Sequence, residues 1–185
     1  MSNKFEDNKE TREVIETAQL ETPSIKYKGS FIEALKEFHK EGKYIYLDVE
    51  ELENDFDAFL QNIPEIRKEI NKVPESEFWL INNDQYIGRI SIRHELNDEL
   101  LTEGGHIGYA ISPLHRKKGY GKKALELGLM EAKKLGLKKV LITTDNDNLG
   151  SIAIIESQGG ILENEVSGKE EGPPVLRYWI DLSEE

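Results

Sequence analysis

Nine residues near the middle of the chain, His115 to Lys123 (HRKKGYGKK), combine five Lys or Arg side chains with two glycines. A predicted strand, His106 to Ser112, comes just before them, and a predicted helix to about Leu135 comes just after. A glycine-rich turn at a helix start can bind phosphate, because free backbone N–H groups converge there and the helix dipole adds partial positive charge. Cations beside such a turn favour a ligand with several phosphate charges. The turn therefore predicts a site for a polyanionic cofactor.

One cofactor that uses such a turn is a nicotinamide dinucleotide. Gly119, Gly121 and Ala124 match the pattern G-x-G-x-x-G/A, and Asp145 lies about where a ribose-binding acid is expected. In dinucleotide folds, however, the glycines follow the strand almost directly, whereas residues 113–118 intervene here. A chain of 185 residues is also short for two mononucleotide-binding halves. A nicotinamide enzyme is therefore the disfavoured alternative.

The same turn resembles the acyl-CoA site of the GNAT superfamily of N-acetyltransferases more closely. The signature of that superfamily, Q/R-x-x-G-x-G/A, occurs here as Arg116-Lys117-Lys118-Gly119-Tyr120-Gly121. A second motif of the superfamily, N-x-x-A/S-x-x-x-Y-E-x-x-G-F, is held in register by Asn148, Ser151, Glu156 and Gly159. Residues 103–163 as a whole resemble a bacterial subgroup with GGHIGY and RRKGY motifs, and residues 78–97 resemble it more weakly.

The resemblance implies a fold. It is a mixed α/β (α+β) GNAT domain with a central twisted, mostly antiparallel sheet and helices on both faces. In that fold the fourth strand splays from a parallel fifth strand, and the pantetheine arm of acetyl-CoA lies in the gap. Periodicity alone supports only an α/β or α+β domain. We expect residues 1–13 to be a flexible polar segment and residues 14–185 to form a single domain.

The expected elements follow from hydrophobic periodicity and turn residues. Ser30 is predicted to cap the first helix, and Pro64 predicts an interruption of the second. Asn82 to Asp84 predicts a hairpin turn, and a polar loop is expected over residues 95–103. Helices are predicted over residues 30–40, 55–70, from the glycine turn to about 135, and 148–157. Strands are predicted over residues 14–21, 44–47, 77–81, 86–93, 106–112, 138–144, 161–166 and 175–182.

The resemblance also implies cofactor contacts for particular residues. Main-chain groups of Ile111 would pair with the pantetheine arm, and Asn148 would bond to the same region. Arg116 sits where the family often has Gln or Arg. Without the resemblance, this turn is an ordinary basic helix start and Asn148 is an ordinary N-cap. The backbone N–H groups that would hold the pyrophosphate are those of Lys117, Lys118, Gly119, Tyr120, Gly121 and Lys122.

The implied reaction is direct attack of an amine on the thioester carbonyl of acetyl-CoA, so a base or a water chain must take the proton of the amine. Relatives often place Glu at the start of the fourth strand, and His106 holds that position here. Because histidine titrates near pH 6.5, His106 is predicted to be the general base, with His94 as a second candidate. The alternative for His106 is a histidine satisfied by strand packing.

One group that the family often uses is absent. Many GNAT enzymes carry Tyr seven residues after the helix-capping Asn, near the departing sulfur, but that residue is Ile155 here, and Gly160 replaces the usual aromatic residue. Either the thiolate leaves without a side-chain acid or another tyrosine reaches it. The absence of this tyrosine keeps open a different function, that of a non-enzymatic acyl-CoA-binding or regulatory module.

Composition limits the partners. The formal net charge of -12 disfavours nonspecific binding to DNA or RNA. Four loop carboxylates are either ordinary solvated loop charge or would attract the amine acceptor, a small molecule or a peptide, if it is cationic: Glu95, Asp98, Glu99 and Glu103. The absence of cysteine excludes disulfides and thiolate chemistry, and no metal site is predicted. Since no long apolar run and no secretion signal occur, we expect a cytoplasmic protein without a membrane span, as a monomer or homodimer.

Overall fold

Seven strands in two sheets form the centre of this computed structural model, which describes residues 15–168 and 172–183. The segment predicted to be flexible, residues 1–13, lies outside the described residues. Every ladder in the two sheets is antiparallel. The first sheet has the order β1 (Gln19–Glu21), β2 (Glu75–Asn82), β3 (Gln85–Arg93) and β4 (Ile107–Ile111), and the second has the order β5 (Lys139–Asp145), β7 (Val175–Asp181) and β6 (Ile161–Val166).

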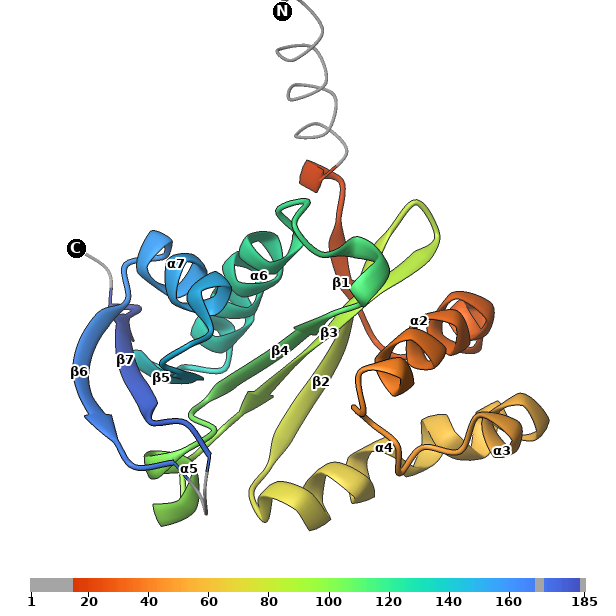
Figure 1. Cartoon of the computed structure of the whole chain (residues 1–185), viewed down its shortest axis with the longest axis horizontal. Coiled ribbons are helices and arrows are strands. Elements are labelled where there is room, and N and C mark those ends of the chain that lie inside the picture. Colours follow the sequence, from red (N-terminus) through yellow and green to blue (C-terminus); the bar gives the residue numbers. More distant parts are fainter. Residues whose placement is uncertain (1–14, 169–171, 184–185) are drawn as a thin grey trace, which may run out of the picture.

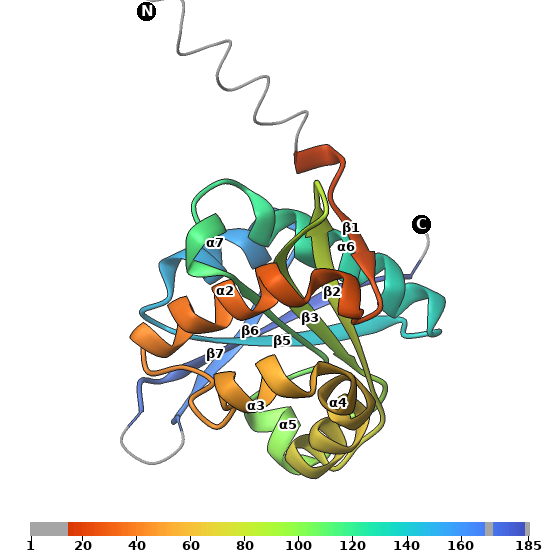
Figure 2. The same cartoon turned by 90° about the vertical axis from the view of Figure 1, so that its right-hand side faces the viewer.

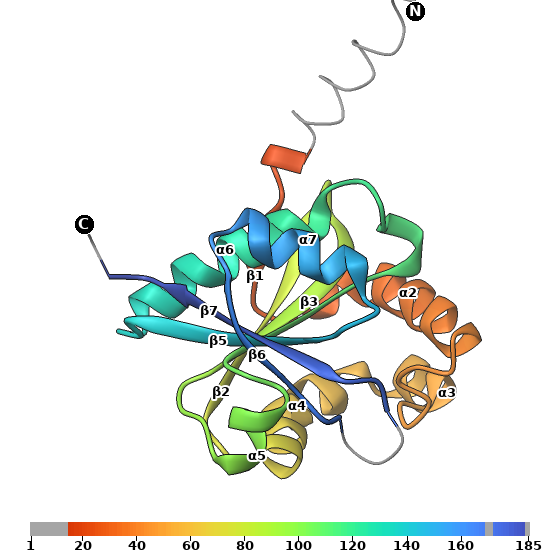
Figure 3. The same ribbon diagram turned by 60° about the vertical axis from the view of Figure 1, so that its left-hand side comes forward.

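Helices cover opposite sides of these strands (Figure 1). Figure 2 shows α2, α3 and α4 in front of β2 and β3, and Figure 3 shows α6 and α7 on one side of the second sheet with α5 on the other. The predicted α/β architecture with helices on both faces is therefore confirmed. The α-helices are α2 (Lys28–Lys40), α3 (Val49–Asn54), α4 (Phe56–Asn71), α5 (Asp98–Thr102), α6 (Tyr120–Lys134) and α7 (Leu149–Ser157), with 3-10 turns η1 (Ile25–Tyr27) and η2 (Pro113–His115).

Helix α6 follows the glycine turn as predicted and packs on β3 and β4. Its buried stripe includes Leu125 and Ala132, and Gly128 lies so close to Ile90 that a Cβ would be 2.2 Å from the Ile90 Cδ1 atom. The helix ends close to the predicted end at about residue 135, and Gly136, with φ of +85°, follows it. This packing fixes the position of the turn relative to the end of β4.

The predicted hairpin joins β2 to β3. Asn83 and Asp84 both have positive φ, the backbone geometry that a two-residue hairpin turn requires. On β3, Arg89, Ser91 and Arg93 share one face, because side chains alternate between the two faces of a strand. That face is covered by α2 and α4, so these polar side chains lie inside the protein.

Two predicted helix boundaries are wrong. Helix α4 runs without a break through Pro64, because its buried stripe, which includes Phe56 and Ile63, outweighs the loss of one backbone hydrogen bond. Helix α2 begins at Lys28, since η1 leads directly into it. Ser30 therefore lies inside the helix, where its hydroxyl accepts from the Tyr86 N–H at 3.0 Å instead of capping.

Short local structures also differ from the prediction. Residues 44–47, predicted to be extended, form a turn in which the Leu47 N–H donates to the Tyr44 carbonyl at 3.0 Å. The predicted polar loop contains α5, and α3 was not predicted. Asp48 and Asn97 cap these two helices, but six or fewer residues cannot show a helical repeat. No helix among residues 15–168 and 172–183 is long and apolar enough to span a membrane.

Candidate active site

The two sheets meet at one crossing, just before β4. The His106 N–H donates to the Leu141 carbonyl at 2.7 Å, and the Gly104 N–H donates to the Thr143 hydroxyl at 2.8 Å. Strands β4 and β5 belong to different sheets and share no ladder, so they separate beyond this crossing. A cavity of about 310 Å³ lies in the resulting gap. The splayed strands predicted from the family resemblance are present.

Gly105 allows this close crossing. Its φ is +61°, and a Cβ atom there would lie 2.4 Å from the Leu141 carbonyl oxygen. The Arg93 guanidinium holds the same segment, because it donates to the carbonyls of Gly104 at 2.8 Å and Gly105 at 2.9 Å. Packing between the sheets thus requires the second glycine of the Gly-Gly pair, whereas a Cβ atom at Gly104 would meet the Leu100 side chain of α5.

Gly105→Ala is expected to lower the free energy of unfolding by about 2 kcal/mol or more, since the left-handed backbone strains alanine and the new methyl group must push Leu141 away. Gly42→Ala is the matched control, because Gly42 has φ of +71° but nothing within 4 Å of its Cβ position. Urea unfolding of both variants measures the difference. Equal losses of unfolding free energy in Gly105→Ala and Gly42→Ala would contradict the close crossing of the sheets.

The free main-chain groups of β4 face the gap. At the start of the β3–β4 ladder, the Arg93 N–H donates to the His106 carbonyl at 2.8 Å. Because bonded positions alternate along an antiparallel strand, the even-numbered residues of β4 bond to β3. The N–H and carbonyl groups of Ile107 and Tyr109 and the N–H of Ile111 therefore point away from β3, where they can pair with an extended ligand. The Ile111 carbonyl already accepts from Arg116.

The glycine turn lies beyond the end of β4. Gly119, with φ of +96°, is the N-cap of α6. The first-turn N–H groups of Tyr120, Gly121 and Lys122 have no acceptor inside the helix, as at every helix start. The Tyr120 side chain is buried and its hydroxyl accepts from the Asn82 amide at 2.9 Å, so this residue offers a ligand its backbone. Lys117 and Lys118 add exposed positive charge.

Arg116 holds the turn against its surroundings. Its guanidinium donates to both carboxylate oxygens of Glu41, at 2.7 and 2.8 Å, and to the Ile111 carbonyl at 3.2 Å. It also lies over the Phe38 ring. Arg116 thus links α2, β4 and the turn, and its predicted contact with a cofactor stays a prediction.

Asn148 caps α7, where its side-chain oxygen accepts from the Ser151 N–H at 3.1 Å. Both residues also line the gap. The capping alternative is therefore present in the structure, and the amide nitrogen of Asn148 has no partner among the described residues. Its predicted contact with the pantetheine arm remains a prediction.

His106, the predicted base, is buried at the crossing. Its Nδ1 accepts from the Leu141 N–H at 2.9 Å, so the proton of the neutral ring lies on Nε2. Burial, with a smaller effect from Arg93, lowers the pKa of His106 from 6.5 to about 4. The residues that line the gap do not include it. This geometry matches the packing alternative, and the catalytic role stays a prediction. His94, the second candidate, is exposed and its Nε2 lies 2.8 Å from the Ser76 hydroxyl.

The lowered pKa of His106 predicts a pH-dependent stability. Between pH 4 and 6.5 the unfolded chain binds a proton at His106 that the folded chain does not. The contribution of neutral His106 to the free energy of unfolding is thus complete above pH 6.5 and is lost as the pH falls toward 4. Urea unfolding at pH 7 and 5 should show a smaller pH dependence for His106→Asn than for the parent protein. Identical dependences would contradict the lowered pKa.

Two other side chains in the gap were not predicted to be catalytic. Glu103 lines the gap, and one of its carboxylate oxygens is buried without a hydrogen-bond partner in the described part of the chain. The Tyr109 hydroxyl lies 3.0 Å from the Ser151 hydroxyl, and burial raises the pKa of Tyr109. Ile155, at the position of the expected tyrosine, is fully buried in the core. The sequence feature that could have pointed to Tyr109 was its position after Gly108 in the alternating pattern of the β4 strand.

Comparisons with known proteins show the family and the fold of the chain. A family model described as acetyltransferase (GNAT) domain matches residues 32–161, more than half of the chain. A comparison with curated proteins found no significant match. Within described residues 15–168 and 172–183, no group of three or more His, Asp or Glu side chains could hold a metal ion.

Solved structures share the fold at low identity. The microcin C7 self-immunity acetyltransferase MccE, in complex with acetyl-CoA and AMP, has a TM-score of 0.65 and 16% identity, with 89% of this chain and 92% of that chain covered. YncA of Salmonella typhimurium with acetyl-CoA has a TM-score of 0.60 and 16% identity, with 91% and 95% covered. A spermidine N-acetyltransferase SpeG chimera from Vibrio cholerae and hSSAT has a TM-score of 0.60 and 17% identity, with 89% and 95% covered.

Proposed function

Since the chain belongs to the GNAT acetyltransferase family, we propose that it transfers the acetyl group of acetyl-CoA to a primary amine of a small molecule or peptide. The observation that carries this proposal is that the start of α6 adjoins β4 beside the gap, since a Cβ atom at Gly121 would lie 3.9 Å from side-chain atoms of both Tyr109 and Ile111. The main-chain groups of Ile107 and Tyr109 and the N–H of Ile111 do not bond to β3, and they lead to the open N–H groups at the start of α6. A pantetheine arm would pair with the first set, and the pyrophosphate would bind the second.

The chemistry needs one proton acceptor and one proton donor. Glu103 takes the proton of the attacking amine, since its carboxylate lines the gap and has an unused oxygen. The amine nitrogen then bonds to the acetyl carbon and the carbon–sulfur bond breaks. Tyr109 is protonated at neutral pH and gives its proton to the leaving thiolate, to be restored from solvent. His106, the base expected from the sequence, is the competing candidate for the first step.

Release of the coenzyme A thiol from acetyl-CoA in the presence of an amine panel tests the function. A thermal-shift comparison of acetyl-CoA, coenzyme A and NAD accompanies it. Stabilisation by acetyl-CoA and coenzyme A but not NAD, together with amine-dependent thiol release, is the expected result. Stabilisation by NAD alone would instead favour the dinucleotide alternative.

A non-enzymatic acyl-CoA-binding module is the second candidate, and the buried Ile155 at the usual tyrosine position favours it. Such a module would be stabilised by acetyl-CoA but would release no thiol with any amine. A single domain over residues 14–185, a cytoplasmic location and a monomeric or homodimeric state stay predictions.

A further inference from the structure

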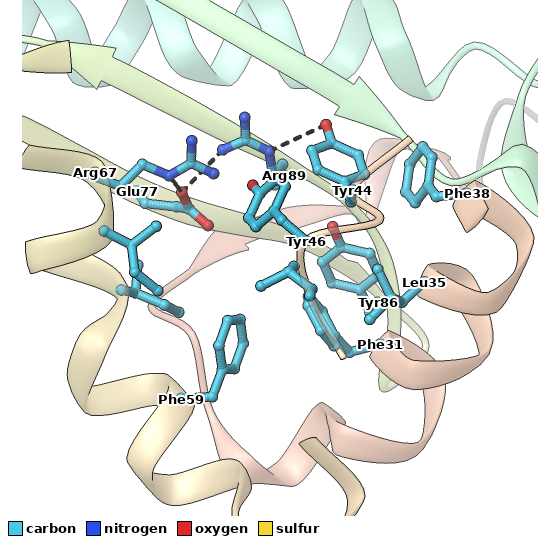
Figure 4. Close-up of a pocket in the computed structure, with 13 residues that line it drawn as sticks. Phe31, Leu35, Phe38, Tyr44, Tyr46, Phe59, Arg67, Glu77, Tyr86 and Arg89 are labelled. Atoms are coloured by element: carbon cyan, nitrogen blue, oxygen red, sulfur yellow. Dashed lines mark hydrogen bonds and ion pairs between the residues drawn. The ribbon is translucent and has the colours of Figure 1, made fainter. Parts of the chain in front are cut away.

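A second cavity lies on the face of the first sheet that α2 and α4 cover (Figure 4). We call it the aromatic pocket. Charged side chains of Arg67, Glu77 and Arg89 stand at one end of it, and aromatic rings line the rest, with the Tyr44 ring next to Arg89. The rings come from α2, the turn at 44–47, α4 and β3: Phe31, Phe38, Tyr44, Tyr46, Phe59 and Tyr86.

The charged end carries an excess of positive charge. One oxygen of Glu77 forms an ion pair with Arg67 Nε at 2.5 Å and accepts from Arg89 at 2.9 Å, so two guanidinium groups share one carboxylate. Their side chains are at most 16% exposed. A second carboxylate, Glu75, does not remove this excess, because it lies 3.7 Å from Arg67 Nε and 3.5 Å from Arg93, so three guanidinium groups face two carboxylates. A low-exposure site with unbalanced charge favours a ligand of the opposite sign.

Hydrogen-bond donors also outnumber acceptors at this end. Among the described residues, Arg67 uses only Nε, and Arg89 uses Nε, toward the Tyr44 hydroxyl at 3.5 Å, and one terminal nitrogen. Three terminal guanidinium nitrogens are therefore free, and the Tyr86 hydroxyl beside them has no partner either. A carboxylate accepts several such bonds and matches the planar geometry of guanidinium.

The aromatic pocket lies close to the gap. Arg89 pairs with Ala110 of β4 in the β3–β4 ladder. Neighbouring strands are about 5 Å apart, so a group bound to Arg89 lies one strand away from the edge that faces the gap. Glu103 lines the gap itself. An acceptor molecule bound between Arg89 and Glu103 would have its amine near the Glu103 carboxylate and its own carboxylate near Arg67 and Arg89.

We propose that the amine acceptor is a small amino acid-like compound whose carboxylate binds Arg67 and Arg89 and whose apolar side chain packs among the rings of the aromatic pocket. This inference rests on the proposed function. The open cavity measures only about 40 Å³, so a side chain fits when Tyr46 swings outward. Tyr46 is 59% exposed and is thus not held in the core.

Matched acceptor pairs test the proposal on the unmodified protein. Phenylalanine is compared with phenethylamine, and leucine with 3-methylbutylamine, by kcat/KM for thiol release from acetyl-CoA. We expect the carboxylated member of each pair to be favoured about tenfold or more, as one charge-assisted bond to arginine provides. Arg89→Gln should reduce the kcat/KM preference for the carboxylated acceptor to about threefold. Arg177→Gln is the control, because Arg177 is a low-exposure guanidinium paired with Glu163 on the second sheet, and it should keep the preference.

Binding without transfer separates this inference from the proposed function. Hydrocinnamate, which has the ring and the carboxylate but no amine, should bind more tightly than 3-phenylpropanol in calorimetry, and Arg89→Gln should remove the difference. If amines are acetylated without preference for a carboxylate and hydrocinnamate binds no better than the alcohol, the proposal is overturned while the function stands. If hydrocinnamate binds as expected but no amine is acetylated, the pocket assignment stands and the proposed function fails.

Discussion

Gly119→Val should weaken acetyl-CoA binding by about tenfold or more, because two effects act on the same turn. Gly119 has φ of +96°, a backbone conformation that a β-branched residue rarely adopts, and a Cβ atom there would also lie 3.0 Å from the Ile15 Cδ1 atom. The valine variant must therefore change the direction in which the first N–H groups of α6 point. Those N–H groups are the proposed pyrophosphate site, and tenfold corresponds to about 1.4 kcal/mol.

Calorimetric titration with acetyl-CoA measures this loss, and Lys118→Ala is its control. Lys118 is exposed and its ammonium donates to the Leu114 carbonyl at 3.0 Å, so its removal leaves the backbone of the turn in place. We expect Lys118→Ala to weaken binding by about threefold or less, since an exposed charge acts through a screened interaction. An unchanged affinity in Gly119→Val, with the variant folded, would show that coenzyme A does not bind at this turn.

Glu103→Gln should lower kcat by about a hundredfold or more, the usual contribution of a general base. Glutamine keeps the shape of the side chain but cannot take a proton from the amine. Because the backbone that would hold acetyl-CoA is untouched, the affinity for acetyl-CoA should change little. The pH–rate profile should also lose its acidic limb, which reports the titration of the base.

His106→Asn distinguishes the two candidate bases. Asparagine can still accept the Leu141 N–H through its side-chain oxygen, so the crossing between the sheets is preserved. If Glu103 is the base, this variant keeps the acidic limb and loses less activity than Glu103→Gln. A hundredfold loss with removal of the acidic limb in His106→Asn, but not in Glu103→Gln, would restore His106 to the role predicted from the sequence.

Features governed by neighbouring residues were predictable from the sequence. The glycine turn, the stop of α6 at Gly136 and the Asn83–Asp84 hairpin each depend on backbone conformations that a few residue types favour. The Asn148 cap is equally local, because its side chain bonds three residues ahead. The spacing of these signals also carried the family resemblance, which the match over residues 32–161 confirms.

Local signals failed where a distant contact decided the outcome. Pro64 predicted a break, but the buried stripe of α4 keeps the helix continuous. The prediction of His106 as the base also rested on a local signal. The HIGY motif marked His106, yet whether its ring reaches the gap or packs against β5 depends on Leu141, which lies 35 residues away.

The sequence by itself determined the glycine turn at Gly119 to Gly121 that opens α6 and, with it, the family. Only the tertiary structure showed that Glu103 and Tyr109 line one gap, that Arg116 is bound to Glu41 across 75 residues, and that two arginines share Glu77 beneath α4. The physical reason is the range of the forces involved. Turn and cap preferences act over a few residues, whereas burial and ion pairing depend on which elements the folded chain brings together.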